Sequence, residues 1–227
     1  MPFKLKNVVP WGRSFEEYLA MFSLSKNDLE MSILGCGDGP ASFNNEMNKL
    51  GKKIISVDPI YQFTKTDIKS RIDETFKTVI EQTVKNKTEF VWEKIKTVKE
   101  LAEVRKKAMD LFLSDYELGK REGRYVFGRL PNLKFEAQQF DLALCSHFLF
   151  LYSKQFPYQF HIESIEELCR VAKEVRIFPI LELGSEVSRH FAKVCNHLQT
   201  LGFETEVINV EYEFQKGGNQ YFKIYNK

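Results

Sequence analysis

The chain has 227 residues, enough for one α/β domain with additions to its core. Hydrophobic residues make up 43% of the chain and charged residues 28%, which are the values of an ordinary soluble globular protein and show no low-complexity character. The formal net charge of +2 does not by itself suggest a nucleic-acid partner.

The beginning of the chain lacks the apolar region of a signal peptide. Its apolar run from Leu142 to Tyr152 is shorter than the roughly 20 residues that a membrane-spanning helix needs. The four cysteines are widely spaced and form no C-x-x-C pair. We therefore expect reduced thiols, a cytoplasmic location and no membrane partner.

Residues 1–28 are predicted to form an extended lead-in followed by a helix. Ser14 can cap that helix, because Glu17 stands three residues later as in a capping box. Tyr18 and Phe22 lie on one apolar face at helical spacing. We expect this helix to cover one end of a sheet.

The stretch from Met31 to Phe43 (MSILGCGDGPASF) joins an apolar strand-like run to a glycine loop and then to a helix-like segment. Glycines allow positive φ angles and let a ligand approach the backbone closely. Residues 52–58 predict a second strand that ends at Asp58. Asp58 follows the loop by about 20 residues, a spacing typical of a carboxylate that binds ribose hydroxyls. The alternative is an aspartate that merely caps a turn.

Residues 62–124 are predicted to form an inserted helical cap. Apolar residues recur at helical spacing from Ile68 to Val84 and again from Val91 to Tyr116, with charges of both signs on the other faces. An insertion after the second strand emerges near the carboxyl edge of the sheet, where ligands bind in α/β folds. It could line an acceptor pocket or act as a lid; a dimer surface or plain decoration is the alternative.

The rest of the chain predicts alternating strands and helices, then a hairpin whose Gly217-Gly218 pair suggests a tight turn. The expected elements are a third strand at 125–127, a buried fourth strand at 142–145, a helix at 162–172, a fifth strand at 174–180, a helix at 185–201 and two strands at 203–214 and 220–225.

Taken in order, ILGCGDG (33–39), Val57-Asp58, FDLALC (140–145) and the closing hairpin resemble the class I S-adenosylmethionine-dependent methyltransferases. The resemblance covers residues from about 29 to the C-terminus. It implies a doubly wound α/β fold with a seven-stranded, mostly parallel sheet and an antiparallel last strand. The dehydrogenase loop G-x-G-x-x-G fits poorly, because Ala41 or Ser42 stands where its third glycine would be.

The resemblance also implies S-adenosylmethionine as the cofactor, and positions for its contacts. Asp58 would accept hydrogen bonds from the ribose, and Arg13 could hold the methionine carboxylate, although a solvated arginine is the alternative. The full set of expected cofactor contacts is Gly35, Cys36, Gly37, Asp58, Pro59, Ile60, Leu130, Cys145 and Arg13.

Chemistry is expected at the carboxyl end of the fourth strand. His147 is the candidate general base, because imidazole titrates near neutral pH; a hydrogen-bonded core histidine is the alternative. Ser146, Phe148 and Tyr152 are the expected acceptor contacts. No spacing of histidine, cysteine or carboxylate residues indicates a metal site.

Two positions depart from the family pattern. Ile33 stands where the family usually has an acid, two residues before the first loop glycine, and Asp38 is the residue nearby that could compensate. Arg129 stands where the family often has an acid that binds adenine. We expect each lost polar contact to weaken cofactor binding by about 1 kcal/mol.

These features predict an enzyme that transfers a methyl group to a small or medium-sized acceptor. A non-catalytic module that binds S-adenosylmethionine or a nucleotide and acts through a partner is the alternative, and an enzyme using NAD or FAD is a second one. The Asn-Pro-Pro-Tyr signature is absent after the fourth strand, which argues against nucleic-acid amino groups as acceptors. The insertion leaves a homodimer open.

Overall fold

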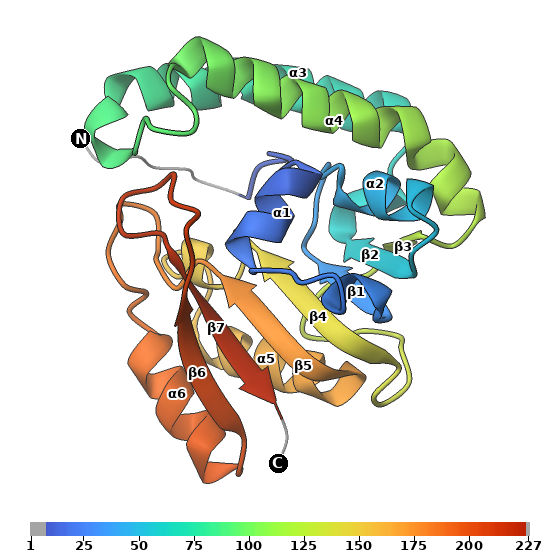
Figure 1. Ribbon diagram of the computed structural model, residues 1–227, viewed down its shortest axis with the longest axis vertical. Coiled ribbons are helices and arrows are strands. Elements are labelled where there is room, and N and C mark those ends of the chain that lie inside the picture. Colours follow the sequence, from blue (N-terminus) through green and yellow to red (C-terminus); the bar gives the residue numbers. More distant parts are fainter. Residues whose placement is uncertain (1–7, 226–227) are drawn as a thin grey trace.

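The fold is built on a seven-stranded sheet with the strand order β3-β2-β1-β4-β5-β7-β6. The structure is a computed structural model that describes residues 8–225 (Figure 1). Strands β1 to β5 pair in parallel, and β7 lies antiparallel between β5 and β6. This confirms the predicted sheet. The strands are β1 (Ile33–Cys36), β2 (Ile54–Asp58), β3 (Tyr125–Phe127), β4 (Phe140–Ser146), β5 (Ala172–Phe178), β6 (Glu204–Asn209) and β7 (Gln220–Tyr225).

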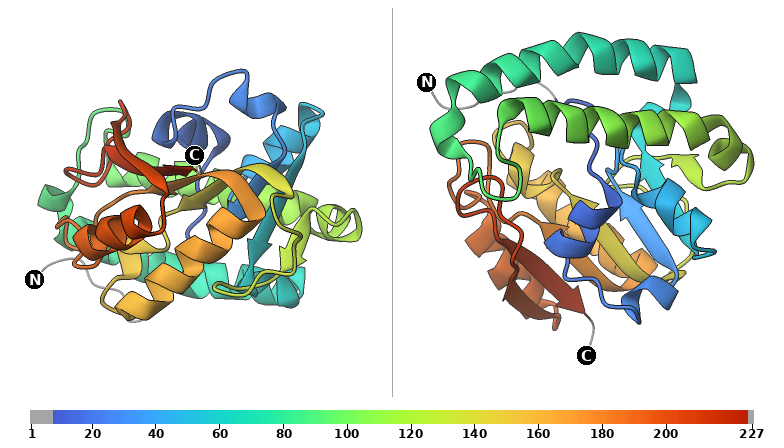
Figure 2. Two further views of the ribbon diagram at one scale, coloured as in Figure 1. Left: turned by 90° about the horizontal axis from the view of Figure 1, so that it is seen from below. Right: turned by 45° about the horizontal axis from the view of Figure 1, so that its top comes forward.

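Helices cover both faces of the sheet, and Figure 2 shows α1 and α2 on one face and α5 and α6 on the other. The helices are α1 (Phe15–Met21), α2 (Phe43–Lys49), α3 (Lys65–Lys85), α4 (Val98–Arg121), α5 (Tyr158–Val171) and α6 (Phe191–Thr200). Short 3₁₀ turns lie at Asp28–Glu30, Pro59–Gln62, Lys87–Glu89 and Phe150–Tyr152.

Strand β4 shows why the middle of a central strand is apolar at consecutive positions. Successive side chains of a strand point to opposite faces. Leu142 and Leu144 pack in the cluster that holds α1 and α2, whereas Ala143 and Cys145 pack in the cluster that holds α5 and α6. A stretch of strand that is buried on both faces, such as Leu142 to Cys145, therefore consists of apolar residues in succession.

Helices α3 and α4 lie side by side across the carboxyl ends of the parallel strands (Figures 1 and 2). Helix α3 starts at a capping box, in which the Thr64 hydroxyl accepts from the Asp67 amide and the Asp67 carboxylate accepts from the Thr64 amide. Both helices bury one apolar stripe, and Ile72 and Phe112 meet there above Tyr61. The insertion thus covers the carboxyl ends of the parallel strands.

Helix α1 begins as predicted, with a capping box between Ser14 and Glu17. Residues 1–7 of the predicted lead-in lie outside the described residues. Among residues 8–225, the structure contains no helix that combines the length and apolarity needed to cross a bilayer.

Several predicted boundaries at the C-terminal side are wrong. Helix α6 starts at Phe191 rather than 185, because the chain before it turns back and pairs Leu181 with Val187. Helix α5 starts directly after Pro157, earlier than predicted. Strand β5 covers Ala172–Phe178, two residues earlier than predicted, and ends before Pro179.

The predicted tight hairpin is also wrong. Strand β6 ends at Asn209, and residues 210–219 form a long connection instead. Tyr212 and Phe214 leave the ladder because they are buried in the cluster under α1. The alternating apolar residues after Asn209 therefore reflect core packing and not strand pairing.

Candidate cofactor and acceptor pocket

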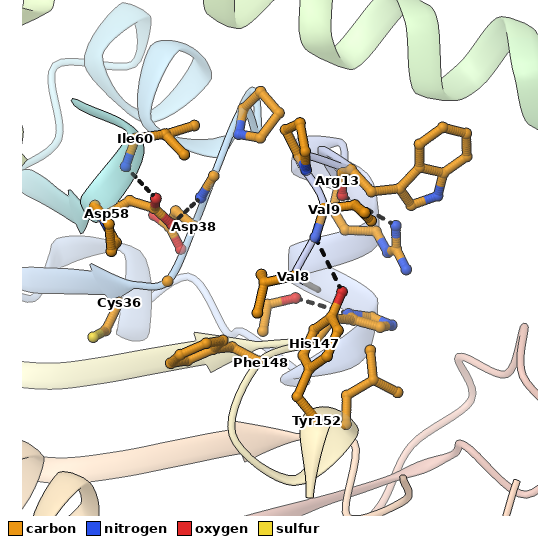
Figure 3. A pocket seen from close by; sticks show the side chains of 18 of the residues that line it. Val8, Val9, Arg13, Cys36, Asp38, Asp58, Ile60, His147, Phe148 and Tyr152 are labelled. Carbon is orange, nitrogen blue, oxygen red and sulfur yellow. Dashed lines mark hydrogen bonds between the residues drawn. The ribbon is translucent and has the colours of Figure 1, made fainter. Parts of the chain in front are cut away.

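One large pocket lies at the carboxyl edge of the sheet, beneath α3 and α4. Its volume is about 970 Å³. It lies where the strand order reverses between β1 and β4, the position at which open α/β sheets bind ligands. Figure 3 shows Cys36, Asp38, Asp58 and Ile60 on one side of it and Arg13, His147 and Tyr152 on the other.

The glycine loop forms the floor of the pocket and requires glycine at position 37. Gly37 has a φ of +69°, and a Cβ there would lie 3.1 Å from the Phe148 ring. The Gly37 amide donates to the Val57 carbonyl over 2.9 Å, which ties the loop to β2. Gly37 therefore lets the loop pack closely against Phe148 and β2, and its backbone lines the pocket.

Asp58 ends β2 with its carboxylate on the pocket wall. Its Oδ1 accepts from the Ile60 amide at 2.8 Å and its Oδ2 from the Gly39 amide at 2.9 Å. Each oxygen keeps a second lone pair for a ligand hydroxyl. Burial raises the pKa of Asp58 to about 6, although the two amides oppose that shift.

Asp38 is a second buried carboxylate in the same wall. Its Oδ1 accepts from the Tyr18 hydroxyl at 2.8 Å and its Oδ2 from the Ser56 hydroxyl at 2.6 Å. Burial raises the pKa of Asp38 to about 6. Sequence reasoning named Asp38 without a partner, because Tyr18 and Ser56 are distant in the chain.

Two predicted cofactor contacts do not line the pocket. A Cβ on Gly35 would lie 1.8 Å from the Asp38 carboxylate, so Asp38 fills the space next to this glycine. Cys145 is fully buried in the core cluster with α5 and α6, and burial raises the pKa of its thiol to about 12. The remaining predicted contacts line the pocket, namely Cys36, Gly37, Asp58, Pro59, Ile60, Leu130 and Arg13.

Arg13 brings an unpaired guanidinium to the pocket. Its Nη1 donates to the Trp11 carbonyl at 3.3 Å, and its Nε is buried without a hydrogen-bond partner. Within residues 8–225, no carboxylate lies within ion-pair distance of Arg13. The side chain is thus available to an anionic group of a ligand.

Ser146 ends β4, His147 and Phe148 follow it, and all three line the pocket. His147 has a φ of +53°, which is unusual for a residue other than glycine. Its Nδ1 lies 2.9 Å from the Ser146 hydroxyl. Burial lowers the pKa of His147 well below its usual range, and the charges of Arg13 and Arg105 act in the same direction. The imidazole is therefore neutral at physiological pH.

The N-terminal strap, residues 8–11, closes one side of the pocket. The Val9 amide donates to the Tyr152 hydroxyl at 3.4 Å, and Trp11 packs on Phe76 of α3. Tyr152 thus holds the strap as well as lining the pocket.

The far half of the pocket is lined by the cap. Residues of α3 and α4 contribute here together with the two connections 86–97 and 210–219; they are Ile68, Arg71, Val79, Thr83, Glu89, Phe90, Leu101, Phe214 and Gln215. The Val91 amide donates to the Phe214 carbonyl at 2.8 Å, and Phe90 stacks on Phe214 at 5.0 Å. The sequence predicted that the insertion could line a pocket, but the contact of residues 86–97 with residues 210–219 had no signal in it.

A buried ion pair fixes the cap on α1. Arg105 of α4 donates through Nη1 and Nη2 to the two carboxylate oxygens of Glu17, and the Tyr212 hydroxyl donates to Glu17 Oε1 at 2.8 Å. Burial alone would raise the pKa of Glu17, but the Arg105 charge lowers it to about 2. In residues 8–225, no group of three or more histidine, cysteine or acidic side chains is arranged to hold a metal ion.

Comparison with known proteins gives one clear sequence relative. The uncharacterised protein MJ0045 of Methanocaldococcus jannaschii is 35% identical over 218 residues, which is 95% of each chain. No protein-family model matches the chain.

Solved structures with similar shape include two methyltransferases. A TehB-like SAM-dependent methyltransferase from Corynebacterium glutamicum is 13% identical with a TM-score of 0.47, covering 94% of this chain and 88% of that one. A putative S-adenosyl-L-methionine-dependent methyltransferase from Methanococcus maripaludis is 13% identical with a TM-score of 0.46, covering 94% and 83%. Because both scores are below 0.5, the fold assignment depends on the chain's own strand order.

Proposed function

This chain belongs to the same protein family as MJ0045, and we propose that it is a methyltransferase that uses S-adenosylmethionine to methylate a small or medium-sized acceptor. The observation that supports this most directly is the single pocket at the reversal point of a class I methyltransferase sheet. That pocket joins the glycine loop, Asp58 and the end of β4 on one side to the cap on the other.

The residues in the half of the pocket opposite the cap, which comprises the glycine loop, the end of β2 and Arg13, fit S-adenosylmethionine. Asp58 would accept hydrogen bonds from the ribose hydroxyls with its remaining lone pairs. Ile60 and Pro59 would pack against the adenine. The Gly37 backbone lines the pocket where the methionine part would lie, and Arg13 has an unpaired guanidinium for its carboxylate.

The missing family acids are partly replaced in this arrangement. Ile33 is buried in the core and cannot contact a ligand. Asp38 lines the pocket with a carboxylate held by Tyr18 and Ser56, and would supply the negative charge that Ile33 lacks. Arg129 is an exposed residue that lines the pocket, so adenine would be held there by Leu130 and by backbone groups.

Methyl transfer needs orientation and exclusion of water more than acid–base chemistry. The sulfonium of the cofactor supplies the methyl group. Phe148 and Tyr152 would position the acceptor beside it, and the cap and strap would exclude water. His147, neutral and oriented by Ser146, would accept a proton where the acceptor has to lose one.

The test is calorimetric titration of the protein with S-adenosylmethionine, S-adenosylhomocysteine and NAD, followed by an acceptor screen. We expect micromolar binding of the first two, weaker binding of NAD, and a loss of about tenfold or more in Asp58→Ala. Asp141→Ala is the matched control, because Asp141 binds Ser32 and Lys173 at the opposite end of β4. Absence of binding to both methionine compounds would reject the proposal.

The non-catalytic alternative makes a different prediction. A binding module would take up S-adenosylmethionine and lose that binding in Asp58→Ala, yet transfer no methyl group to any acceptor. The acceptor screen therefore separates it from an enzyme.

A further inference from the structure

A second hollow lies on the other side of Phe90 from the large pocket. It has a volume of about 490 Å³, and we name it the lysine groove. Its walls come from the two connections and the first turn of α4; they are Lys87, Thr88, Phe90, Trp92, Lys96, Thr97, Val98 and Lys216. Phe90 lines both hollows, so the groove adjoins the acceptor half of the pocket.

The charge of the lysine groove is entirely positive. Lys87, Lys96 and Lys216 line it, and no aspartate or glutamate does. None of these three ammonium groups forms an ion pair with a carboxylate of residues 8–225. On the neighbouring helix faces some lysines are paired with acids, as in Lys69–Asp73 and Lys99–Glu103. Three unpaired ammonium groups therefore belong to residues that line one hollow.

The backbone gives the groove a defined shape. The Lys216 amide donates to the Glu89 carbonyl at 3.0 Å, which joins the two connections that carry the lysines. Trp92 is fixed by its indole N–H, which donates to the Lys87 carbonyl at 2.8 Å, and by edge contact with Phe214 at 5.5 Å. The backbone of the two connections is therefore fixed, and it carries the three lysines to one hollow although they come from distant parts of the chain.

We propose that the lysine groove binds the phosphate group of a small phosphorylated acceptor, whose body passes Phe90 into the large pocket. This inference rests on the proposed function, because it names the acceptor class. Lysine binds phosphate as a compact positive charge, and the charge of three lysines is similar in size to that of one phosphate or diphosphate group. The three lysines would not increase the affinity for an uncharged acceptor.

The observations favour a small molecule over RNA. A nucleic acid is bound through a row of phosphate contacts along an extended basic surface. Here the net charge is only +2, and the outer faces of α3 and α4 carry charges of both signs, several of them paired. The three lysines line one hollow of small volume and do not form a long row.

The experiment uses inorganic pyrophosphate as the probe, titrated calorimetrically at low salt into the full-length protein. The test variant carries Lys87→Gln, Lys96→Gln and Lys216→Gln. The control variant carries Lys26→Gln, Lys53→Gln and Lys193→Gln, three exposed lysines outside both hollows, so that the net charge changes equally. We expect pyrophosphate binding to weaken about tenfold or more in the test variant and about twofold or less in the control.

Three outcomes would overturn the proposal: no pyrophosphate binding to the wild type, equal loss in both variants, or tighter groove-dependent binding of a single-stranded RNA decamer. S-adenosylmethionine affinity is measured on each variant and should stay unchanged. If pyrophosphate binds through the groove while S-adenosylmethionine does not bind at all, the proposed function fails and the phosphate site stands.

A second arm connects the groove to catalysis. Each acceptor found in the screen is treated with phosphatase and assayed again. We expect KM to rise about tenfold or more on dephosphorylation with wild type, and to be insensitive to dephosphorylation in the test variant. An acceptor without phosphate whose KM is equal in the wild type and the test variant would contradict the proposal.

Discussion

Glu17 of α1 and Arg105 of α4 form an ion pair that is closed to solvent, with side-chain exposures of 9% and 0%. The next residue, Tyr18, donates to Asp38 in the glycine loop at 2.8 Å. One turn of α1 therefore connects the cap to the loop that lines the cofactor half of the pocket. A change in the cap can reach the cofactor site through this helix.

Breaking the buried pair should destabilise the protein strongly. Arg105→Met and Glu17→Gln each leave a buried charge without its partner, which costs about 3 kcal/mol or more. Urea unfolding followed by circular dichroism measures the loss. The double variant should lose less than the sum of the two single variants, because neither charge is then left alone.

The exposed pair Lys99–Glu103 on the same helix provides the control for that experiment. Its side chains are 87% and 67% exposed, so Lys99→Met should change the free energy of unfolding by less than about 1 kcal/mol. Equal, small effects of Arg105→Met and Lys99→Met would show that the buried pair does not stabilise the cap.

The two buried carboxylates should make the unliganded protein less stable as the pH rises from about 4 to 6. Burial raises the pKa of Asp38 and of Asp58 from 3.8 to about 6, so the folded state binds these protons more tightly than the unfolded state. Their stabilising contribution is present below pH 4 and is lost as the pH rises through 6. Unfolding measurements from pH 4 to 7 should therefore show a smaller decline in Asp58→Asn.

Asp141→Asn is the matched control for the pH dependence. The Lys173 ammonium and the Ser32 groups lower the pKa of Asp141 to about 2, so its contribution is present above pH 4 and is lost only at lower pH. The decline between pH 4 and 6 should be the same as in the wild type. An unchanged decline in Asp58→Asn would contradict the assignment.

Comparing Gly37→Ala with Gly51→Ala distinguishes the effect of backbone strain from an effect on the pocket. Gly37 and Gly51 share a φ of +69°, but a Cβ meets the Phe148 ring only at Gly37. Backbone strain should reduce the free energy of unfolding by about 1 kcal/mol in each variant, and contact with Phe148 should add to that loss in Gly37→Ala. Only Gly37→Ala should also weaken binding of S-adenosylmethionine, measured by calorimetry. Equal affinities in both variants would mean that the loop does not contact the ligand.

His147→Asn tests the proton acceptor. Asparagine tolerates the positive φ of position 147, so the backbone should keep its conformation. For an acceptor that has to lose a proton, we expect kcat to fall about 10²-fold or more while S-adenosylmethionine affinity stays within about threefold. His197→Asn, a change to a surface histidine paired with Glu166, is the control and should leave kcat unchanged. An unchanged kcat in His147→Asn would remove His147 from the chemistry.

The local parts of the site were predictable from residue patterns. A glycine is needed wherever φ is positive, an apolar run marks a buried strand, and a capping box marks a helix start. These rules identified the loop at Gly37, the end of β2 at Asp58 and the first helix at Ser14. They worked because each depends on neighbours only a few residues away.

The same local rules were wrong where tertiary packing overrides them. The apolar alternation through Tyr212 and Phe214 suggested a continuing strand, but these side chains pack under α1 and against the cap. The glycine at 35 suggested ligand contact, but the Asp38 carboxylate occupies that space.

The sequence by itself determined the sheet, its two faces and the edge at which a ligand would bind, because strand pattern and loop chemistry are encoded within short segments. Only the tertiary structure decided the contact of residues 86–97 with residues 210–219 in the far wall of the pocket, the pairing of Glu17 with Arg105 and the position of three lysines at one hollow. Such contacts join residues that are far apart in the chain, and their geometry leaves no periodic signal in the sequence.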